Sequence, residues 1–181
     1  LQPIQINNSQ EVQFPELKGY TDVKFPNQLK GKNNSSTILT AEHPEFSFLL
    51  PEMAGNLKFG IIDGKKSKWL SESKTKEYKQ VGNQIIYTLS DPIIGKGKLV
   101  VETISLSNTD GIVVEVSTEN IPENLQLFWS FGGVYGKELT PNETKTLNPL
   151  YCRDNVFSVE QTAFTVYYGE SMKLKVIQGV M

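Results

Sequence analysis

The residues best suited to chemistry in this sequence are aromatic and charged side chains gathered in three short stretches. FWSFGGVYGK (128–137) sets aromatic residues among glycines, YCRD (151–154) combines an aromatic ring with both charges, and FSVE (157–160) ends in an acid. Sugar rings stack on tryptophan and tyrosine faces, while nearby polar side chains hydrogen-bond the sugar hydroxyls. The pattern therefore predicts carbohydrate contact by these residues: Trp129, Tyr135, Tyr151, Arg153, Asp154 and Glu160.

The same residues also admit structural interpretations. Trp129 shares strand parity with Leu125 and Leu127, which favours a position in the core. Arg153 is the only arginine in the chain, and its planar, bidentate donor group suits either an internal carboxylate pair or a ligand. Tyr135 follows two glycines that permit a tight turn, so it is expected in a constrained loop.

No catalytic residue is predicted, because no nucleophile motif or base accompanies these side chains. His43 lies two residues before Glu45, and Pro44 favours extended backbone there, which is typical of a histidine in a loop or at a strand end. Cys152 is the only cysteine and His43 the only histidine, so a zinc site lacks ligands and an internal disulfide framework is excluded. Neither a metal nor a cofactor is expected.

Length and charge restrict the partners. A chain of 181 residues fits one domain that buries roughly 70% of the surface it exposes when unfolded. The net charge is −2 and the lysines are scattered, so no basic face is expected to bind nucleic acid. No apolar run approaches the roughly 18 to 20 residues that span a bilayer, so no membrane span is expected.

The elements that must position these side chains are strands. Helical spacing of apolar residues is almost absent, whereas short β-branched and aromatic runs alternate with turn residues. The sequence therefore predicts an all-β, antiparallel β-sandwich of the supersandwich kind, with few or no helices. The predicted strands are 45–50, 57–62, 84–89, 98–106, 112–117, 125–131, 156–160, 162–168 and 172–177.

Two hairpins are marked by their turns. SNTDG (107–111) reverses the runs 98–106 and 112–117, and Asp63-Gly64 reverses LKFGII toward Trp69. In the first hairpin, one apolar face is predicted from alternation in each strand. The residues of those faces are Ile112, Val114 and Val116 in the later strand, and Val100, Ile104 and Leu106 in the earlier one.

The domain organisation is simple. Prolines at positions 3, 15 and 26 disfavour central strands, so residues 1–30 are expected to form an extended arm that packs on a sandwich of residues 31–181. Residues 30–36 and 137–147 are expected to be surface loops.

The order of the motifs resembles a domain-of-unknown-function family of Bacteroidetes, family 4450. The matching motifs, from about Glu45 to Gly169, are NLKFGI, SKWL, YTLSDPIIGKGKL, LFWSFGGVYGK and YCRDNVFSVE…FTVYYG. The resemblance implies a β domain similar to the N-terminal supersandwich that precedes a six-hairpin (α/α) glycoside hydrolase barrel in polysaccharide-utilisation systems. It implies a carbohydrate setting and a periplasmic or secreted location, and the chain shows no signal-peptide pattern of its own.

Three functions are compatible with this sequence. The first is a non-catalytic domain that supports the C-terminal catalytic barrel of a glycoside hydrolase, and it predicts an exposed apolar patch. The alternative is an independent carbohydrate-binding module that displays a row of exposed aromatic rings. A stand-alone hydrolase would have to use Glu160 or Asp154, the acids in aromatic surroundings.

Overall fold

The computed structural model describes residues 24–33, 35–51, 53–135, 155–167 and 176–180. Within these ranges the chain is almost entirely antiparallel β-structure, with two short 3-10 turns at Leu70–Glu72 and Pro92–Ile94. The predicted all-β class is confirmed. No described helix is long or apolar enough to cross a membrane.

The largest sheet, sheet A, has six strands. Its strands follow the order β1-β2-β3-β4-β10. β5 pairs with residues 60–62 at the end of β4, on the side of β4 opposite β10. The strands are β1 (Asn27–Leu29), β2 (Thr37–Thr40), β3 (Glu45–Leu50), β4 (Met53–Ile62), β5 (Ser67–Trp69) and β10 (Gln126–Tyr135). β1 thus joins the last residues of the predicted arm to the sheet, while residues 1–23 lie outside the described residues.

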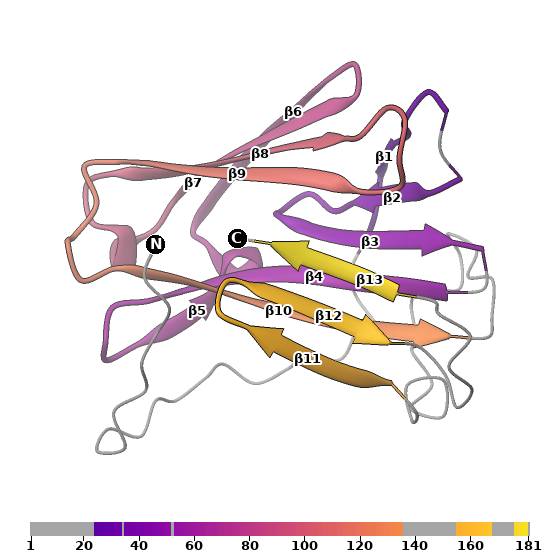
Figure 1. Cartoon of the computed structure of the whole chain (residues 1–181). Coiled ribbons are helices and arrows are strands. Elements are labelled where there is room, and N and C mark those ends of the chain that lie inside the picture. The colour runs from indigo at the N-terminus through magenta and orange to yellow at the C-terminus, as the bar shows by residue number, and fades with distance from the viewer. Residues whose placement is uncertain (1–23, 34, 52, 136–154, 168–175, 181) are drawn as a thin grey trace.

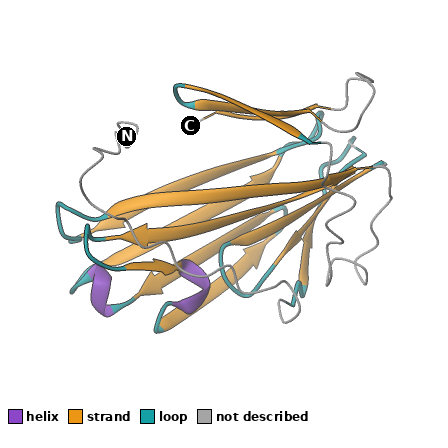
Figure 2. Ribbon diagram, turned by 90° about the horizontal axis from the view of Figure 1, so that it is seen from below, coloured by secondary structure: helices purple, strands orange, loops and turns teal. Residues whose placement is uncertain are grey.

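Sheet B is a four-stranded meander, β6-β7-β8-β9, in which each strand pairs with the next one along the chain. Its strands are β6 (Thr75–Val81), β7 (Gln84–Ser90), β8 (Lys98–Ser105) and β9 (Ile112–Glu119). Sheet C has three strands, β11 (Val156–Glu160), β12 (Ala163–Tyr167) and β13 (Val176–Val180). Sheet C lies in front of sheet A and below sheet B in Figure 1, and Figure 2 shows it as a separate short layer.

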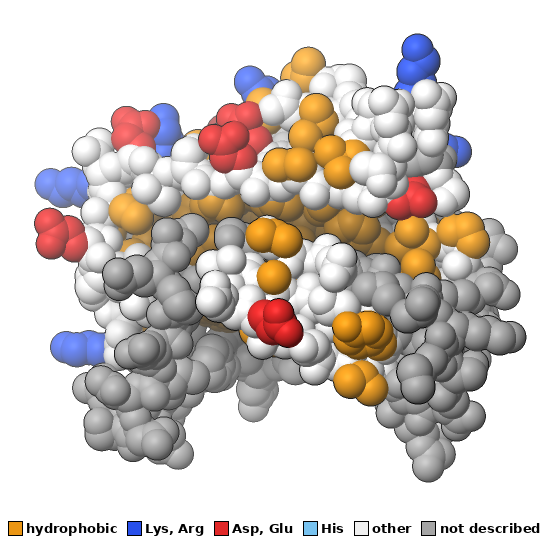
Figure 3. Space-filling model, viewed as in Figure 1, with side chains coloured by type: hydrophobic (Ala, Val, Ile, Leu, Met, Phe, Trp, Pro, Cys, Tyr) orange, Lys and Arg blue, Asp and Glu red, His pale blue; other side chains and the backbone are white. Residues whose placement is uncertain are grey.

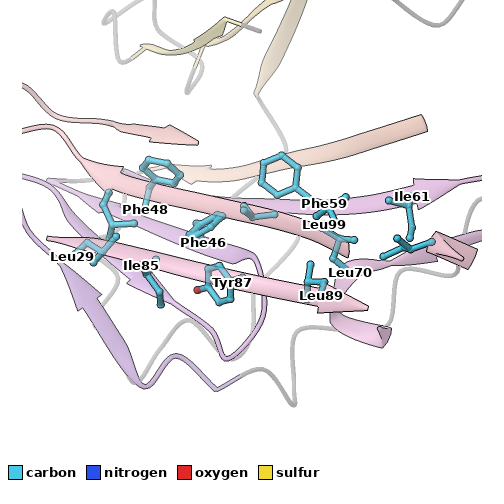
Figure 4. Packing of buried hydrophobic residues seen from close by; sticks show 13 residues of the cluster. Leu29, Phe46, Phe48, Phe59, Ile61, Leu70, Ile85, Tyr87, Leu89 and Leu99 are labelled. Atoms are coloured by element: carbon cyan, nitrogen blue, oxygen red, sulfur yellow. The ribbon is translucent and has the colours of Figure 1, made fainter. Parts of the chain in front are cut away.

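The main core lies between sheets A and B (Figure 4). Phe46 of β3 meets Tyr87 of β7 with ring centroids 6.1 Å apart, and it meets Phe59 of β4 at 6.3 Å. Burial raises the pKa of Tyr87 well above its ordinary value, so its hydroxyl stays protonated and donates to the Ala41 carbonyl at 2.9 Å. The two large sheets therefore share one aromatic centre.

Sheet C packs on sheet A through aromatic rings. The Phe164 ring of β12 lies 4.7 Å from the Trp129 ring and 5.3 Å from the Phe131 ring, both on β10. Phe131 in turn meets Phe48 of the core at 6.4 Å. The face of β10 that carries Trp129 and Phe131 is therefore shared between the core and sheet C.

The predicted hairpins are confirmed, but one predicted face is wrong. β8 pairs with β9 and β4 pairs with β5, as the turn residues indicated. In β9 the alternation is also correct, because Ile112, Val114 and Val116 face the core. In β8 the buried residues are Leu99, Val101, Thr103 and Ser105, whereas Val100 is partly exposed and Ile104 lies outward at 46% exposure.

Some strands of the structure were not predicted, and one predicted strand lies at a different place in the sequence. β1, β2 and β6 were not predicted, and β6 is exposed along its whole length. The strand predicted at 172–177 overlaps β13 at Val176 and Ile177, and its remainder lies outside the described residues. The loop predicted at 137–147 also lies outside them.

Candidate functional site

The two predicted sugar-contacting residues whose side chains are described lie on opposite sides of sheet C. Trp129 is half-buried, with its ring packed against Phe164 on the inward side of that sheet. Glu160 is exposed at the end of β11, paired with Ala163 on the outward side. The structure therefore does not bring these two residues together. Tyr135 was expected in a constrained loop, but it is the last residue of β10 and pairs with Met53, because the glycines before it continue the strand. Its side chain lies outside the described part of the structure, as do Tyr151, Arg153 and Asp154.

A polar cluster lies on the face of sheet A that points away from the core. The buried Glu45 carboxylate accepts a hydrogen bond from Asn56 Nδ2 at 3.2 Å, and His43 Nε2 lies 3.0 Å from Glu45 Oε2. Lys58 Nζ lies 3.9 Å from the same Oε2. Strand register explains this grouping, because Glu45 pairs directly with Lys58 and Ser47 with Asn56 between β3 and β4.

Aromatic rings border the polar cluster on one side. Lys58 Nζ lies 4.8 Å from the centre of the Trp69 ring, and the Trp69 ring lies 5.1 Å from the Phe128 ring. Gly60 separates the two strands that carry these rings, and a Cβ at this position would overlap the Phe128 ring. The Lys58 ammonium therefore lies between a buried carboxylate and an aromatic face, and both attract a cation.

The composition of the polar cluster favours a structural role. It contains one carboxylate, one imidazole and one ammonium, and the carboxylate is neutralised by its neighbours. Among the described residues, no group of three or more histidine, cysteine, aspartate or glutamate side chains is placed to share a metal ion. Removing one member would leave another charge buried, so the cluster fixes the register of β3 on β4.

A small cavity of about 340 Å³ lies where β5 meets the turn before β8. Asp91 is its central acid, and its Oδ2 accepts hydrogen bonds from Lys68 Nζ at 2.7 Å and from the Lys74 backbone N–H at 2.9 Å. Burial raises the pKa of Asp91, but these bonds, together with one from the Ile93 backbone N–H, outweigh it and lower the pKa below its ordinary value. Each charged group at the centre of the cavity thus has a partner within the protein.

The apolar surface is the more unusual feature. A hollow lined by apolar side chains runs between sheet B and sheet C (Figure 3), and it follows the inward faces of β9 and β10. The partly buried apolar residues in and next to these strands are Ile112, Val114, Val116, Leu125 and Leu127. Sheet C also exposes large apolar side chains, namely Val156, Phe157, Val159, Tyr167 and Val180.

These surfaces were only partly predictable. The alternation in β9 and β10 predicted which residues face inward. It could not show that an apolar hollow lies between sheets B and C (Figure 3). The polar cluster had a weaker signal, because EFSFLL places Glu45 and Ser47 on the face opposite Phe46. Alternation alone reads such polar residues as solvent-exposed, whereas Glu45 is fully buried.

A family model described as a domain of unknown function (DUF4450) matches residues 50–179. This match spans most of the chain, from the end of β3 to β13. No curated protein and no solved structure matches the chain.

Proposed function

The chain belongs to the DUF4450 family, and from this membership we propose that it is a non-catalytic β-sandwich domain of a bacterial glycoside hydrolase. In this role it packs against the helical catalytic barrel of the same polypeptide and supports it. The link to polysaccharide breakdown rests on the resemblance of its strand motifs to a supersandwich that precedes such a barrel. The link to packing rests on the surface of sheet C.

The observation that carries the proposal is the uncovered inward face of β11. Phe157 pairs with Val166, and Val159 pairs with Phe164, so both share the face by which Phe164 contacts β10. Val166 on that face is fully buried, yet Phe157 is 51% exposed and Val159 is 70% exposed. Sheet C therefore extends beyond β10 and presents exposed apolar side chains that no strand of the described residues covers.

A second domain would supply that layer. Exposed apolar surface of this kind marks sites of protein contact, and burying it is worth roughly 25 cal/mol per Å². A three-stranded sheet of short strands also gains most of its stability from the surface on which it packs. Covering Phe157 and Val159 beside the free side of β10 would stabilise sheet C and join the domains.

The alternative, an independent carbohydrate-binding module, has less support among the described residues. Such a module needs exposed, coplanar aromatic rings. Trp69 is 5% exposed, and one face of Trp129 is packed on Phe164. The tryptophans thus serve packing. The exposed rings among the described residues, Tyr78, Phe157 and Tyr167, lie on β6, β11 and β12 rather than in one row.

The test uses the reading frame that surrounds this chain. We expect it to encode a six-hairpin helical domain, and we expect that domain, supplied separately, to bind the chain in calorimetric titration. Hydrogen exchange should slow in β11 and β12 on binding. The double variant Phe157→Lys, Val159→Lys should weaken binding by about tenfold or more, because two ammonium groups would enter an apolar contact.

The matched control is Val81→Lys, which changes an exposed apolar residue of β6 in sheet B. It should leave binding unchanged. A reading frame without a second domain would overturn the proposal, as would binding that the double variant does not affect. Millimolar glycan binding by the isolated chain, with no contact to a helical domain, would favour the carbohydrate-binding module instead.

A further inference from the structure

The outer strand of sheet B, β9, has an open edge. It pairs with β8 along its whole length, and among the described residues no other strand pairs with it. None of its residues, IVVEVSTE, is a proline or a lysine, and none has a positive φ. Natural edge strands usually carry such features because a free edge otherwise accepts another strand.

The inward side of this edge is apolar and accessible. Ile112, Val114 and Val116 pack on the core but are only partly buried. The apolar hollow between sheets B and C in Figure 3 lies beside this strand. Leu125, just before β10, and Leu127 of β10 are also partly buried against this core. An added strand with an apolar side chain at every second position would fill this hollow with those side chains.

The outward side of the same edge carries the acids Glu115 and Glu119 beside Val113 and Ser117. Glu115 pairs directly with Glu102 of β8, which places two like charges at adjacent positions on one face. Glu102 accepts a hydrogen bond from the neutral Gln84 amide at 2.8 Å, and no ion pair involving Glu115 occurs among the described residues. The nearby Glu119, by contrast, is paired with Lys98 at 2.8 Å. A cation beside Glu115 would relieve the repulsion.

These charges also argue against a second copy of this chain at the edge. An antiparallel copy of β9 would bring its own Glu115 and Glu119 onto the acidic face. Like charges across neighbouring strands are destabilising. The complementary occupant is therefore an apolar and basic strand.

We propose that β9 is a docking edge for an extended polypeptide segment of a partner, in which apolar residues alternate with polar ones and a lysine or arginine faces Glu115. The segment adds to sheet B as an antiparallel fifth strand. Its backbone pairs with the free edge, its apolar side chains cover Val114 and Val116, and its basic side chain lies beside Glu102 and Glu115. This site goes beyond the proposed function, since it uses a surface apart from β11.

The experiment titrates the whole chain with two synthetic peptides of about eight residues, a length that matches β9. In one peptide valine alternates with lysine and threonine, and in the other glutamate replaces lysine. We expect the basic peptide to bind about tenfold more tightly at low salt and to slow hydrogen exchange in β9. Glu115→Lys should reverse this preference.

The matched control is Glu77→Lys on β6, the opposite edge of sheet B, which should leave the preference for the basic peptide unchanged. Val114→Asp should weaken both peptides by about tenfold, because it places a charge in the apolar hollow. Equal binding of the two peptides, protection outside β9, no binding at millimolar peptide, or a dimer that forms through β9 would each overturn the proposal. None of these outcomes depends on whether a helical domain binds sheet C.

Discussion

The two edge strands of sheet B, β6 and β9, differ in how they meet sheet A. On β6, the inward side chains include Lys76, Tyr78 and Gln80, and the Tyr78 ring packs against Tyr87. The two polar ones are tied by hydrogen bonds, since Lys76 Nζ donates to the Ser71 carbonyl at 2.9 Å and Gln80 Nε2 donates to the Gln28 carbonyl of β1 at 3.2 Å. On β9, the inward side chains are valine and isoleucine, and the hollow beside them is open (Figure 3). One edge closes the sandwich and the other leaves it accessible.

This difference shows which edge is joined to its surroundings. Hydrogen bonds from polar side chains hold β6 against neighbouring segments, whereas β9 directs partly buried isoleucine and valine side chains inward. Lys76, Glu77 and Lys79 make β6 a poor template for another chain, since charged edges resist pairing. β9 carries two glutamates but no lysine or proline, although it belongs to the same sheet and is of similar length. Interaction is therefore expected at β9 and not at β6.

The largest expected loss of stability comes from the core residues next to β6, and it should far exceed the loss next to β9. Tyr87→Ala, next to β6, removes a fully buried ring and its hydrogen bond to Ala41, and should lower the free energy of unfolding by about 4 kcal/mol. Val116→Ala, on β9, trims a partly exposed side chain and should cost below about 1 kcal/mol. Urea unfolding measures both. A cost for Val116→Ala close to that for Tyr87→Ala would mean that the hollow is closed in solution.

A smaller change in stability, one that depends on pH, is expected from the turns next to the two edge strands. Asp110, in the turn before β9, accepts hydrogen bonds from Ser35 Oγ at 2.7 Å and the Ser36 backbone N–H at 2.6 Å. The turn before β7 is held by the neutral Asn83, whose amide donates to the Ser105 carbonyl at 2.8 Å. Of these two acceptors and donors, only the Asp110 carboxylate can take up a proton as the pH falls, because the Asn83 amide is neutral.

Burial raises the pKa of Asp110, but the bonds from Ser35 and Ser36 outweigh it, so its folded-state pKa lies below the ordinary 3.8. The stabilisation is therefore complete above that ordinary value and is lost as the pH falls through the lower folded-state pKa. Asp110→Asn should cost about 1 kcal/mol at neutral pH, because the residue is exposed, and almost nothing in strong acid. Asn83→Ala should have a cost that does not vary with pH. Urea unfolding across an acid pH series checks both, and a pH-independent cost for Asp110→Asn would contradict the assignment.

The smallest effect concerns charge on the open edge. Glu115→Gln removes the repulsion with Glu102 and should raise the free energy of unfolding by up to about 0.5 kcal/mol, an effect that salt reduces. The matched change Glu77→Gln on β6, where the paired residue is Thr88, should not stabilise the protein. Denaturant titrations at low and high salt measure the difference. Destabilisation by Glu115→Gln would show that Glu115 already has a cationic partner.

Much of the fold could be predicted because alternation and turn chemistry act locally. EFSFLL is the strand Glu45–Leu50, and the Asp63-Gly64 turn joins β4 to β5 as predicted. β6 escaped prediction because TKEYKQV carries charge on both faces, and its strand form depends on pairing with β7. In β8, Thr103 and Ser105 lie inward while Ile104 lies outward, so hydrophobicity alone assigned the wrong face.

The candidate sites were less predictable because they depend on contacts between distant segments. Glu45 is buried because Asn56 and Lys58 lie opposite it in another strand, and no local pattern indicates that register. Trp129 was correctly placed in a core-facing position, but its packing on Phe164 depends on sheet C. The role of Trp129 and Glu160 in sugar contact stays a prediction.

The two tryptophans of the chain lie on opposite faces of sheet A. Trp69 is buried under the Lys58 ammonium on the outer face, whereas Trp129 faces the core and touches sheet C. The protein therefore carries a separate fluorescent reporter for each side of its largest sheet. Detachment of sheet C would change the surroundings of Trp129 and not those of Trp69. Two variants that each keep one tryptophan would therefore distinguish the loosening of that layer from the unfolding of the whole domain.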